Sequence, residues 1–165
     1  MDNKMDNKIL IAYYSRSGKT KSVANIIQNI VNGTVVEIIP EEAYPTDYNT
    51  VVDQAKKEIS SGFKPALKTK IDNINDYDII FIGSPNWWST IAPPITTFLS
   101  EYDLSGKTVV PFATHGGGGD GHMIPDLKAL CPNSKVLESI CIRDNDAEKS
   151  ESKISDWLKK IGLAE

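Results

Sequence analysis

Five short apolar runs alternate along the chain with segments whose apolar residues recur at helical spacing. The runs cover residues 9–14, 34–39, 78–83, 107–114 and 136–142. The first of them is continuous, which is typical of a strand buried on both faces of a parallel sheet. Successive parallel strands need crossover connections, which are right-handed. The alternation therefore predicts an α/β fold, an open doubly wound parallel sheet with helices on both faces. The length of 165 residues suits one such domain.

The helical segments follow these runs. In the first, apolar residues recur at spacings of three and four over residues 23–31, and Gly33 supplies a stop. Residues 60–76 form a connection without a clear period. Residues 1–8 repeat the tetrapeptide Met-Asp-Asn-Lys, which indicates two start sites or a cloning remnant, so we place the domain at residues 9–165. The remaining helices are expected around residues 51–59, 93–100, 125–130 and 154–161, with Pro93 and Pro94 at the start of one.

The composition is that of an ordinary globular protein. Apolar residues make up 40% and charged residues 24%, and the mean hydropathy is −0.28, which excludes a disordered tail, a collagen and a disulfide scaffold. The net charge of −4 leaves no basic stripe, so we expect no nucleic-acid partner, whereas an acidic surface suits basic protein partners. No run approaches the ~18 apolar residues of a membrane span. We therefore expect a cytoplasmic protein without membrane association.

Cys131 and Cys141 stand ten positions apart in a chain with two cysteines. This spacing fits neither a CxxC redox motif nor a set of zinc ligands, and it favours two buried, reduced thiols. His115 and His122 flank a glycine-rich stretch, but a metal site would need further ligands that the sequence does not place beside them. We therefore predict no metal site.

The loop at residues 15–20 joins the first strand to the first helix. A helix N-terminus offers free backbone amides and positive dipole charge to an anion, and Ser15, Ser17 and Thr20 add hydroxyl groups. Helix capping would account for one of these hydroxyls, but three beside Gly18 favour a phosphate. A P-loop would need another glycine at the position of Tyr13, which argues against a nucleoside triphosphatase.

Two further loops of unusual composition follow the third and fourth strands. Residues 84–90 contain Trp87 and Trp88, whose rings would be partly exposed unless a planar ligand covers them. We expect one of the two rings to pack on the helix at 93–100. Residues 116–121 include five glycines, which permit a ligand to approach the backbone closely. All three loops leave the carboxyl ends of parallel strands, so they are expected to form one site.

The sequence Ser-Arg-Ser-Gly-Lys-Thr after the first strand resembles the phosphate loop of the flavodoxin family. Gly83-Ser-Pro-Asn-Trp-Trp, Pro93-Pro94, Phe98-Leu99, Gly106-Lys107 and Phe112-Ala-Thr-His-Gly-Gly are similar to a bacterial flavodoxin-like subfamily. The resemblance spans about residues 8–163 and implies a five-stranded sheet of order 2-1-3-4-5 with non-covalently bound FMN. The cofactor-binding residues it implies are Ser15, Arg16, Ser17, Gly18, Lys19 and Thr20, then Pro85, Asn86, Trp87 and Trp88, then Thr114, His115, Gly116, Gly117, Gly118, Gly119 and Asp120.

Ser89 departs from the pattern, because the subfamily usually has glycine after the tryptophan pair. In flavodoxins a glycine near this point lets a peptide flip toward N5 of the reduced ring, so Ser89 leaves that redox-linked flip an open question.

The resemblance implies a low-potential electron-transfer protein that works between a reductase and an acceptor enzyme. The alternative is an NAD(P)H-dependent FMN quinone or nitro reductase of the same fold. A third possibility, a flavodoxin-like binding module without FMN, is disfavoured by the intact phosphate loop. Because the hydroxyl-rich helix start at residues 15–20 suits one phosphate, and no GxGxxG stretch follows the first strand to accommodate a pyrophosphate, we expect FMN and not FAD.

Overall fold

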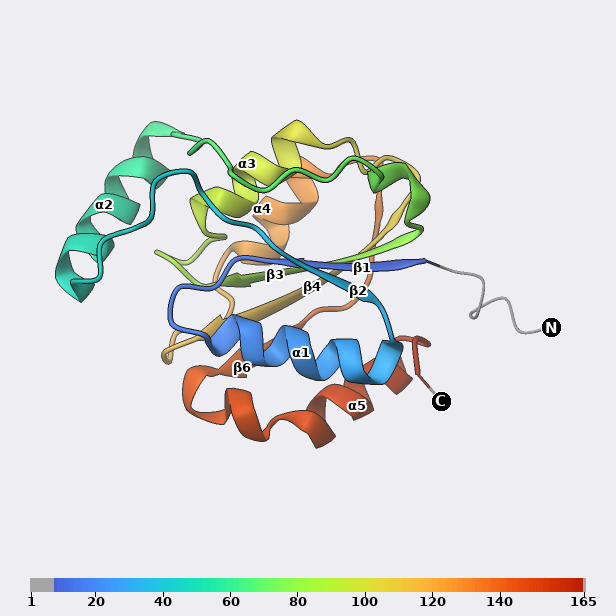
Figure 1. The fold of residues 1–165 in the computed structure, drawn as a ribbon. Helices are drawn as coiled ribbons and strands as arrows, with labels where there is room; N and C mark the ends of the chain where they lie inside the picture. Colours follow the sequence, from blue (N-terminus) through green and yellow to red (C-terminus); the bar gives the residue numbers. More distant parts are fainter. Residues whose placement is uncertain (1–7, 165) are drawn as a thin grey trace.

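The sheet has the strand order β2-β1-β3-β4-β5, with β6 also beside β4, and every strand pair is parallel (Figure 1). This order confirms the predicted fold class. The computed structural model describes residues 8–164, so the expectation for residues 1–7 lies outside the described part. Lys8 stands at the start of the fold, where its carbonyl oxygen accepts hydrogen bonds from two backbone amides. The strands are β1 (Ile9–Tyr13), β2 (Thr34–Glu37), β3 (Ile79–Pro85), β4 (Thr108–His115), β5 (Lys135–Val136) and β6 (Ile140–Arg143).

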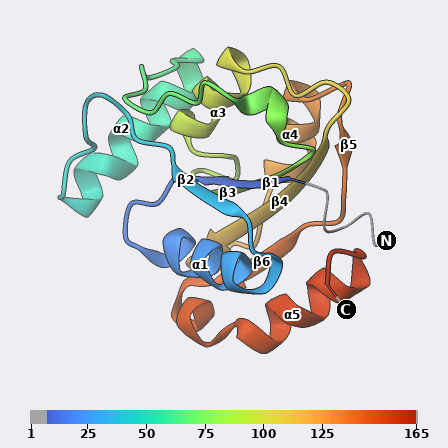
Figure 2. The same ribbon diagram turned by 45° about the vertical axis from the view of Figure 1, so that its right-hand side comes forward.

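Helices cover both faces of the sheet, as predicted. Figures 1 and 2 agree that α1 and α5 lie on one face, whereas α3 and α4 lie on the other. The helix α2 extends past the end of the sheet on the side of α3 (Figure 1). The α-helices are α1 (Lys19–Val31), α2 (Tyr48–Ser61), α3 (Pro93–Glu101), α4 (Met123–Leu130) and α5 (Glu151–Lys160), and the 3-10 helices are η2 (Ile74–Asp76) and η3 (Asp144–Lys149).

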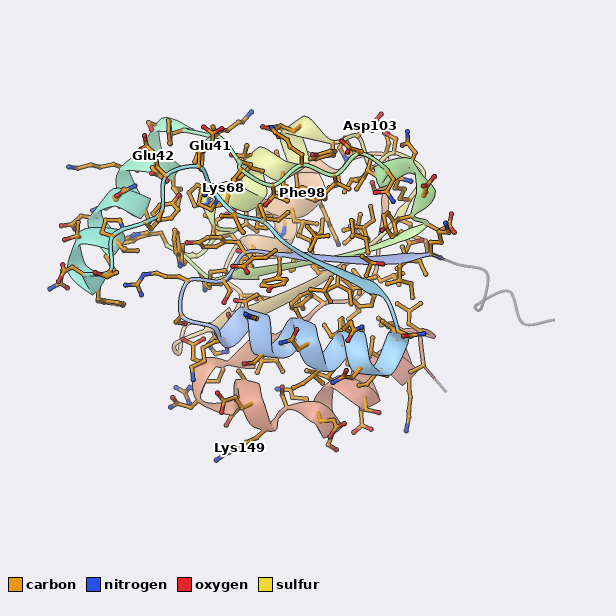
Figure 3. All side chains as sticks on the ribbon, viewed as in Figure 1. Glu41, Glu42, Lys68, Phe98, Asp103 and Lys149 are labelled. Atoms are coloured by element: carbon orange, nitrogen blue, oxygen red, sulfur yellow. The ribbon has the colours of Figure 1, made fainter. Side chains whose placement is uncertain are left out.

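The core is divided by the sheet into two clusters, because side chains alternate along each strand. Leu10 and Ala12 of β1 belong to the cluster under α3 and α4, whereas Ile11 belongs to the cluster under α1 and α5. Phe98, which Figure 3 labels, is fully buried between α3 and the sheet. In the other cluster, under α1 and α5, Gly83 of β3 makes room for the Phe112 ring, since a Cβ atom at Gly83 would lie 2.2 Å from it.

The strand expected at residues 136–142 is interrupted. Glu138 and Ser139 belong to neither β5 nor β6. The carbonyl oxygen of Glu138 accepts a hydrogen bond from Nε1 of Trp157 at 2.9 Å, and its carboxylate pairs with Lys160 at the same distance. The interruption of the strand therefore occurs where Glu138 pairs with α5. Sequence periodicity does not predict this interruption.

The connection at residues 60–76, whose path the sequence did not predict, passes beside the end of β2. The amide of Glu41 donates to the Ala66 carbonyl at 2.8 Å, and the amide of Lys68 donates to the Ile39 carbonyl at 2.7 Å. The hydroxyl of Thr69 accepts from the Ile39 amide at 2.7 Å. The connection thus supplies hydrogen-bond partners to residues 37–41, at the end of the edge strand β2 and just beyond it.

The expectation for the cysteines is right in part. Cys131 and Cys141 are both free, but Cys131 is buried and Cys141 is half-buried. Burial raises the pKa of each thiol to about 11, so both stay protonated at neutral pH. Within residues 8–164, no helix combines the length and apolar character needed to cross a membrane.

Candidate functional site

The three loops predicted to converge do so at the carboxyl ends of the strands. They enclose a cavity of about 380 Å³, a volume within the ~300–1,000 Å³ of small-ligand sites. The predicted residues on its wall are Arg16, Ser17, Thr20, Pro85, Asn86, Trp87, Trp88, Thr114, His115 and Gly116. Seven other predicted residues belong to the loops but not to the wall, namely Ser15, Gly18, Lys19, Gly117, Gly118, Gly119 and Asp120.

The first loop is shaped by its own residues. Gly18 has φ 90°, a left-handed conformation that favours glycine, and α1 begins at the next residue. Oγ of Ser15 accepts hydrogen bonds from the amides of Gly18 at 3.1 Å and Lys21 at 3.3 Å. One hydroxyl therefore does cap the helix. Among the described residues no protein acceptor binds the amides of Lys19 and Thr20, which remain available to an anion.

Thr20 connects the first loop to the central strands. Its side chain is buried, and Oγ1 lies 2.7 Å from Oγ1 of Thr114, the penultimate residue of β4. Each hydroxyl can make a further hydrogen bond besides this one. The pair therefore fixes the beginning of α1 against the end of β4 on the cavity wall.

The second loop is a tight hairpin turn. Trp87 and Thr90 exchange two backbone hydrogen bonds of 3.0 and 3.1 Å across the two residues between them. Those two residues, Trp88 at φ 54° and Ser89 at φ 66°, are both left-handed, as a type I′ turn requires. Such turns favour asparagine and glycine, so a bulky tryptophan here is strained.

The third loop holds this turn in place. The amide of His122 donates to the Ser89 carbonyl at 2.6 Å. Gly121 packs so closely that an added Cβ atom would lie 2.8 Å from backbone and side-chain atoms of Ser89. The strained turn is therefore stabilised by a loop that is remote in sequence.

The two tryptophans have different surroundings. Trp87 is half-buried, and its ring makes edge contacts with Tyr14 at 5.4 Å and Tyr44 at 5.0 Å between centroids. Trp88 is 49% exposed, and its Nε1 donates to the Val52 carbonyl of α2 at 2.9 Å. One ring thus does join the core cluster that includes α3, but its aromatic partners are tyrosines that the sequence argument did not consider.

One of the tyrosines behind Trp87 is hydrogen-bonded to a buried carboxylate. The hydroxyl of Tyr44 donates to Glu58 at 2.5 Å, and Gln54 donates to the other oxygen of Glu58 at 2.9 Å. Burial, and then the hydrogen bond to Glu58, raise the pKa of Tyr44 well above its ordinary value. Burial likewise raises the pKa of Tyr14. Both phenols therefore stay neutral, and Trp87 packs against two uncharged rings, of which Tyr44 is held by its hydrogen bond to Glu58.

The helix α2 supplies a wall that the sequence argument missed. Tyr48, Val51, Val52 and Ala55 line the cavity from this helix, and Asp144 lines it from the start of η3. Their spacing of three and four residues predicts an apolar helix face but not which surface it covers. The available signal was the position of α2 after β2, whose carboxyl end lies at the same edge as the other three strands. Arg16 links this wall to the first loop, since its Nη2 donates to the Thr46 carbonyl at 2.9 Å.

Two buried polar atoms on the cavity residues have no hydrogen-bond partner within the described chain. They are Nε of Arg16, a donor, and Oδ1 of Asn86, an acceptor. The Asn86 amide is oriented by its nitrogen, which donates to the Gly119 carbonyl at 2.7 Å. Leaving such groups unpaired is costly, so the cavity is suited to a ligand that offers both an acceptor and a donor.

Known proteins with the same architecture agree with this geometry. The profile of a family described as Flavodoxin matches residues 8–161. A flavodoxin from Nostoc sp. is 24% identical over an alignment covering 95% of this chain and 96% of the relative.

Solved structures extend the likeness. A candidate flavoprotein from Bacteroides eggerthii superposes with a TM-score of 0.83 at 35% identity, covering 93% of this chain and 97% of the other. A Lactobacillus acidophilus flavoprotein, solved in complex with FMN, has a TM-score of 0.70 at 29% identity, covering 88% and 99%. With a profile match over nearly its whole length and the three loops gathered at one sheet edge, the chain belongs to the flavodoxin family.

Proposed function

We propose that this protein binds FMN in the loop-lined cavity and carries electrons between a reductase and an acceptor enzyme in the cytoplasm. The observation that supports this proposal most is the pair of unpartnered buried atoms, Nε of Arg16 and Oδ1 of Asn86, on opposite loops of one cavity. A flavin nucleotide offers acceptors in its phosphate and ring carbonyls, and donors in its ring N–H and ribityl hydroxyls. Membership of the flavodoxin family supports the same cofactor.

The residues present fit FMN along the length of the cavity. The free amides of Lys19 and Thr20 at the start of α1, with the hydroxyl of Ser17, would hold the phosphate. Asn86 would accept a hydrogen bond from the ligand. The apolar face of α2 and the rings of Trp87 and Trp88 would line the isoalloxazine. The Lactobacillus relative in complex with FMN makes this the natural first ligand to test.

When bound, FMN supplies reversible one- or two-electron transfer, and the chain binds, orients and shields it. Trp87, backed by Tyr14 and Tyr44, excludes water from one wall. Tyr48 is 70% exposed and Trp88 49% exposed at the rim, so this side remains open to a partner protein. An exposed edge suits electron exchange with a docked protein.

The test is reconstitution followed by anaerobic photoreduction. The purified protein is expected to take up one equivalent of FMN but no FAD, to be reduced in two resolved one-electron steps, and to oxidise no NAD(P)H by itself. Failure to bind FMN would contradict the cofactor assignment. Rapid NAD(P)H-dependent quinone or nitro-compound turnover would instead establish the reductase of the same fold.

A further inference from the structure

His115, the last residue of β4, organises the third loop, the glycine loop at residues 116–121, through one ring nitrogen. Its Nδ1 lies 3.0 Å from the Gly117 amide and 3.1 Å from the Gly119 amide, and both amides donate to it. A ring nitrogen that accepts hydrogen bonds carries no proton, so the imidazole is neutral with its proton on Nε2. An imidazolium, which has N–H groups at both positions, could accept neither bond.

The order imposed on the glycine loop reaches the cavity through Asn86. The side-chain nitrogen of Asn86 donates a hydrogen bond to the Gly119 carbonyl oxygen at 2.7 Å. This bond orients the Asn86 side chain, so that its oxygen is left as the acceptor on the other side. The other end, Oδ1, is the buried oxygen without a partner. A chain of hydrogen bonds therefore leads from His115 through Gly119 to Asn86 on the cavity wall.

We propose that His115 is a positioning residue for FMN, that it acts through Gly119 and Asn86, and that it does so only as a neutral imidazole. The inference rests on the proposed function. Protonation of His115 would turn Nδ1 from an acceptor into a donor facing two amides, so the glycine loop would rearrange and Asn86 would lose its orientation. FMN affinity should therefore fall in acid, and by linkage FMN binding at acid pH should release a proton.

The charged groups around His115 have opposite effects on protonation of its imidazole. Arg143 of β6 is in register with it, and Arg16 shares the cavity wall, and both disfavour an imidazolium. The carboxylates of Asp144, also on the wall, and of Asp120, in the glycine loop, favour one. Two further residues of this wall are uncharged, namely Asn86, which follows β3, and Thr20 of α1. Histidine is the side chain whose ordinary titration falls between pH 5 and 8, so this range is the one to examine.

The experiment compares FMN dissociation constants between pH 5.5 and 8 by quenching of flavin fluorescence. In His115→Asn, an oxygen replaces Nδ1 as an acceptor that does not titrate. It should bind FMN within about threefold of the wild type at pH 8 and show a flatter pH profile. In His115→Ala the acceptor is absent, and affinity should fall about tenfold at pH 8, as expected for the loss of roughly two neutral hydrogen bonds.

His122→Asn is the matched control, because it removes the only other histidine of the chain. The His122 side chain is exposed, and its contact to Ser89 is made by the backbone. This variant should retain the wild-type profile. The phosphate of FMN itself titrates near pH ~6 but does so equally in every variant, so only differences between profiles count.

A second readout needs no cofactor. In the apoprotein, the NMR resonances of the Gly117 and Gly119 amides should titrate in the wild type and stay constant over the same pH range in His115→Asn. An Asn variant that keeps the full acid loss of affinity, or an Ala variant that binds like the wild type at every pH, would overturn the inference alone. Absence of FMN binding by the wild type at any pH would overturn the proposed function and this inference with it.

Discussion

The two ends of the cavity are built in different ways. At the phosphate end, residues 15–20, the backbone is shaped by contacts within one short segment, such as the two amides that donate to Ser15. At the ring end, formed by residues 86–89, the glycine loop and α2, the bonds join distant segments. Asn86 and Gly119 are 33 positions apart, and Trp88 and Val52 are 36 apart. The backbone of the phosphate end is therefore shaped mainly by a local motif, which the bond between Thr20 and Thr114 fixes to β4, whereas the ring end depends on bonds between distant segments.

The largest effect is expected from removing the hydroxyls of the phosphate end. Ser17→Ala combined with Thr20→Val should weaken FMN binding by about 3 kcal/mol, because hydrogen bonds to a charged group contribute roughly 1.5–3 kcal/mol each. Riboflavin, which lacks the phosphate, should be affected far less. Titrations of both ligands by fluorescence quenching measure the difference.

Thr114→Val is the control for the double variant. It breaks the same hydrogen bond between Thr20 and Thr114 but leaves both first-loop hydroxyls in place. The ratio of FMN to riboflavin affinity should then stay near that of the wild type. If the double variant weakens both ligands equally, the phosphate does not bind at this end.

A substitution in the glycine loop should disrupt flavin binding at the ring end of the cavity. Gly121→Ala places a Cβ atom 2.8 Å from Ser89, and such overpacking costs roughly 1–3 kcal/mol. Affinity for FMN and for riboflavin should fall together, because both carry the isoalloxazine. Gly106→Ala is matched in backbone strain, with φ 80° and open space around it, and lies outside the cavity. It should cost about 1–2 kcal/mol of stability in urea unfolding without changing either affinity.

Loss of an indole should have a smaller effect on flavin binding. Trp87→Ala and Trp88→Ala should each weaken FMN severalfold and alter the flavin absorption band, since an aromatic pair contributes roughly 0.5–1.5 kcal/mol beyond the area it buries. Phe63→Ala removes an aromatic ring that is exposed but does not line the cavity, and should change neither quantity. Unaltered affinity and spectrum in both tryptophan variants would contradict the ring placement.

The smallest effect should come from relieving the strained turn. Ser89 is left-handed at φ 66°, where glycine carries no steric penalty, so Ser89→Gly should raise the free energy of unfolding by up to about 1 kcal/mol. Urea denaturation of the apoprotein measures this gain. A loss of stability would mean that contacts of the Ser89 side chain outweigh its backbone strain.

Local structure could be predicted from the sequence. The apolar runs predicted the strands and their order through the family resemblance, and Pro93-Pro94 marked the start of α3. Contacts between segments that are distant in the sequence could not be predicted in this way. Spacing along α2 could not say that Val51 and Ala55 face a cavity, and periodicity could not foresee that Glu138 leaves the fifth strand to meet Trp157. The partners of His115 and Asn86 were out of reach for the same reason, since side-chain hydrogen bonds leave no periodic trace.

The central claim is that one FMN molecule spans both ends of the cavity, and amide NMR of the apoprotein titrated with FMN and with riboflavin tests it most directly. FMN should shift the amide resonances of Lys19 and Thr20 together with those of Gly116 and the indole N–H of Trp88. Riboflavin should shift the ring-end signals and leave Lys19 and Thr20 unchanged. Shifts at Lys19 and Thr20 with riboflavin, or none there with FMN, would contradict the account.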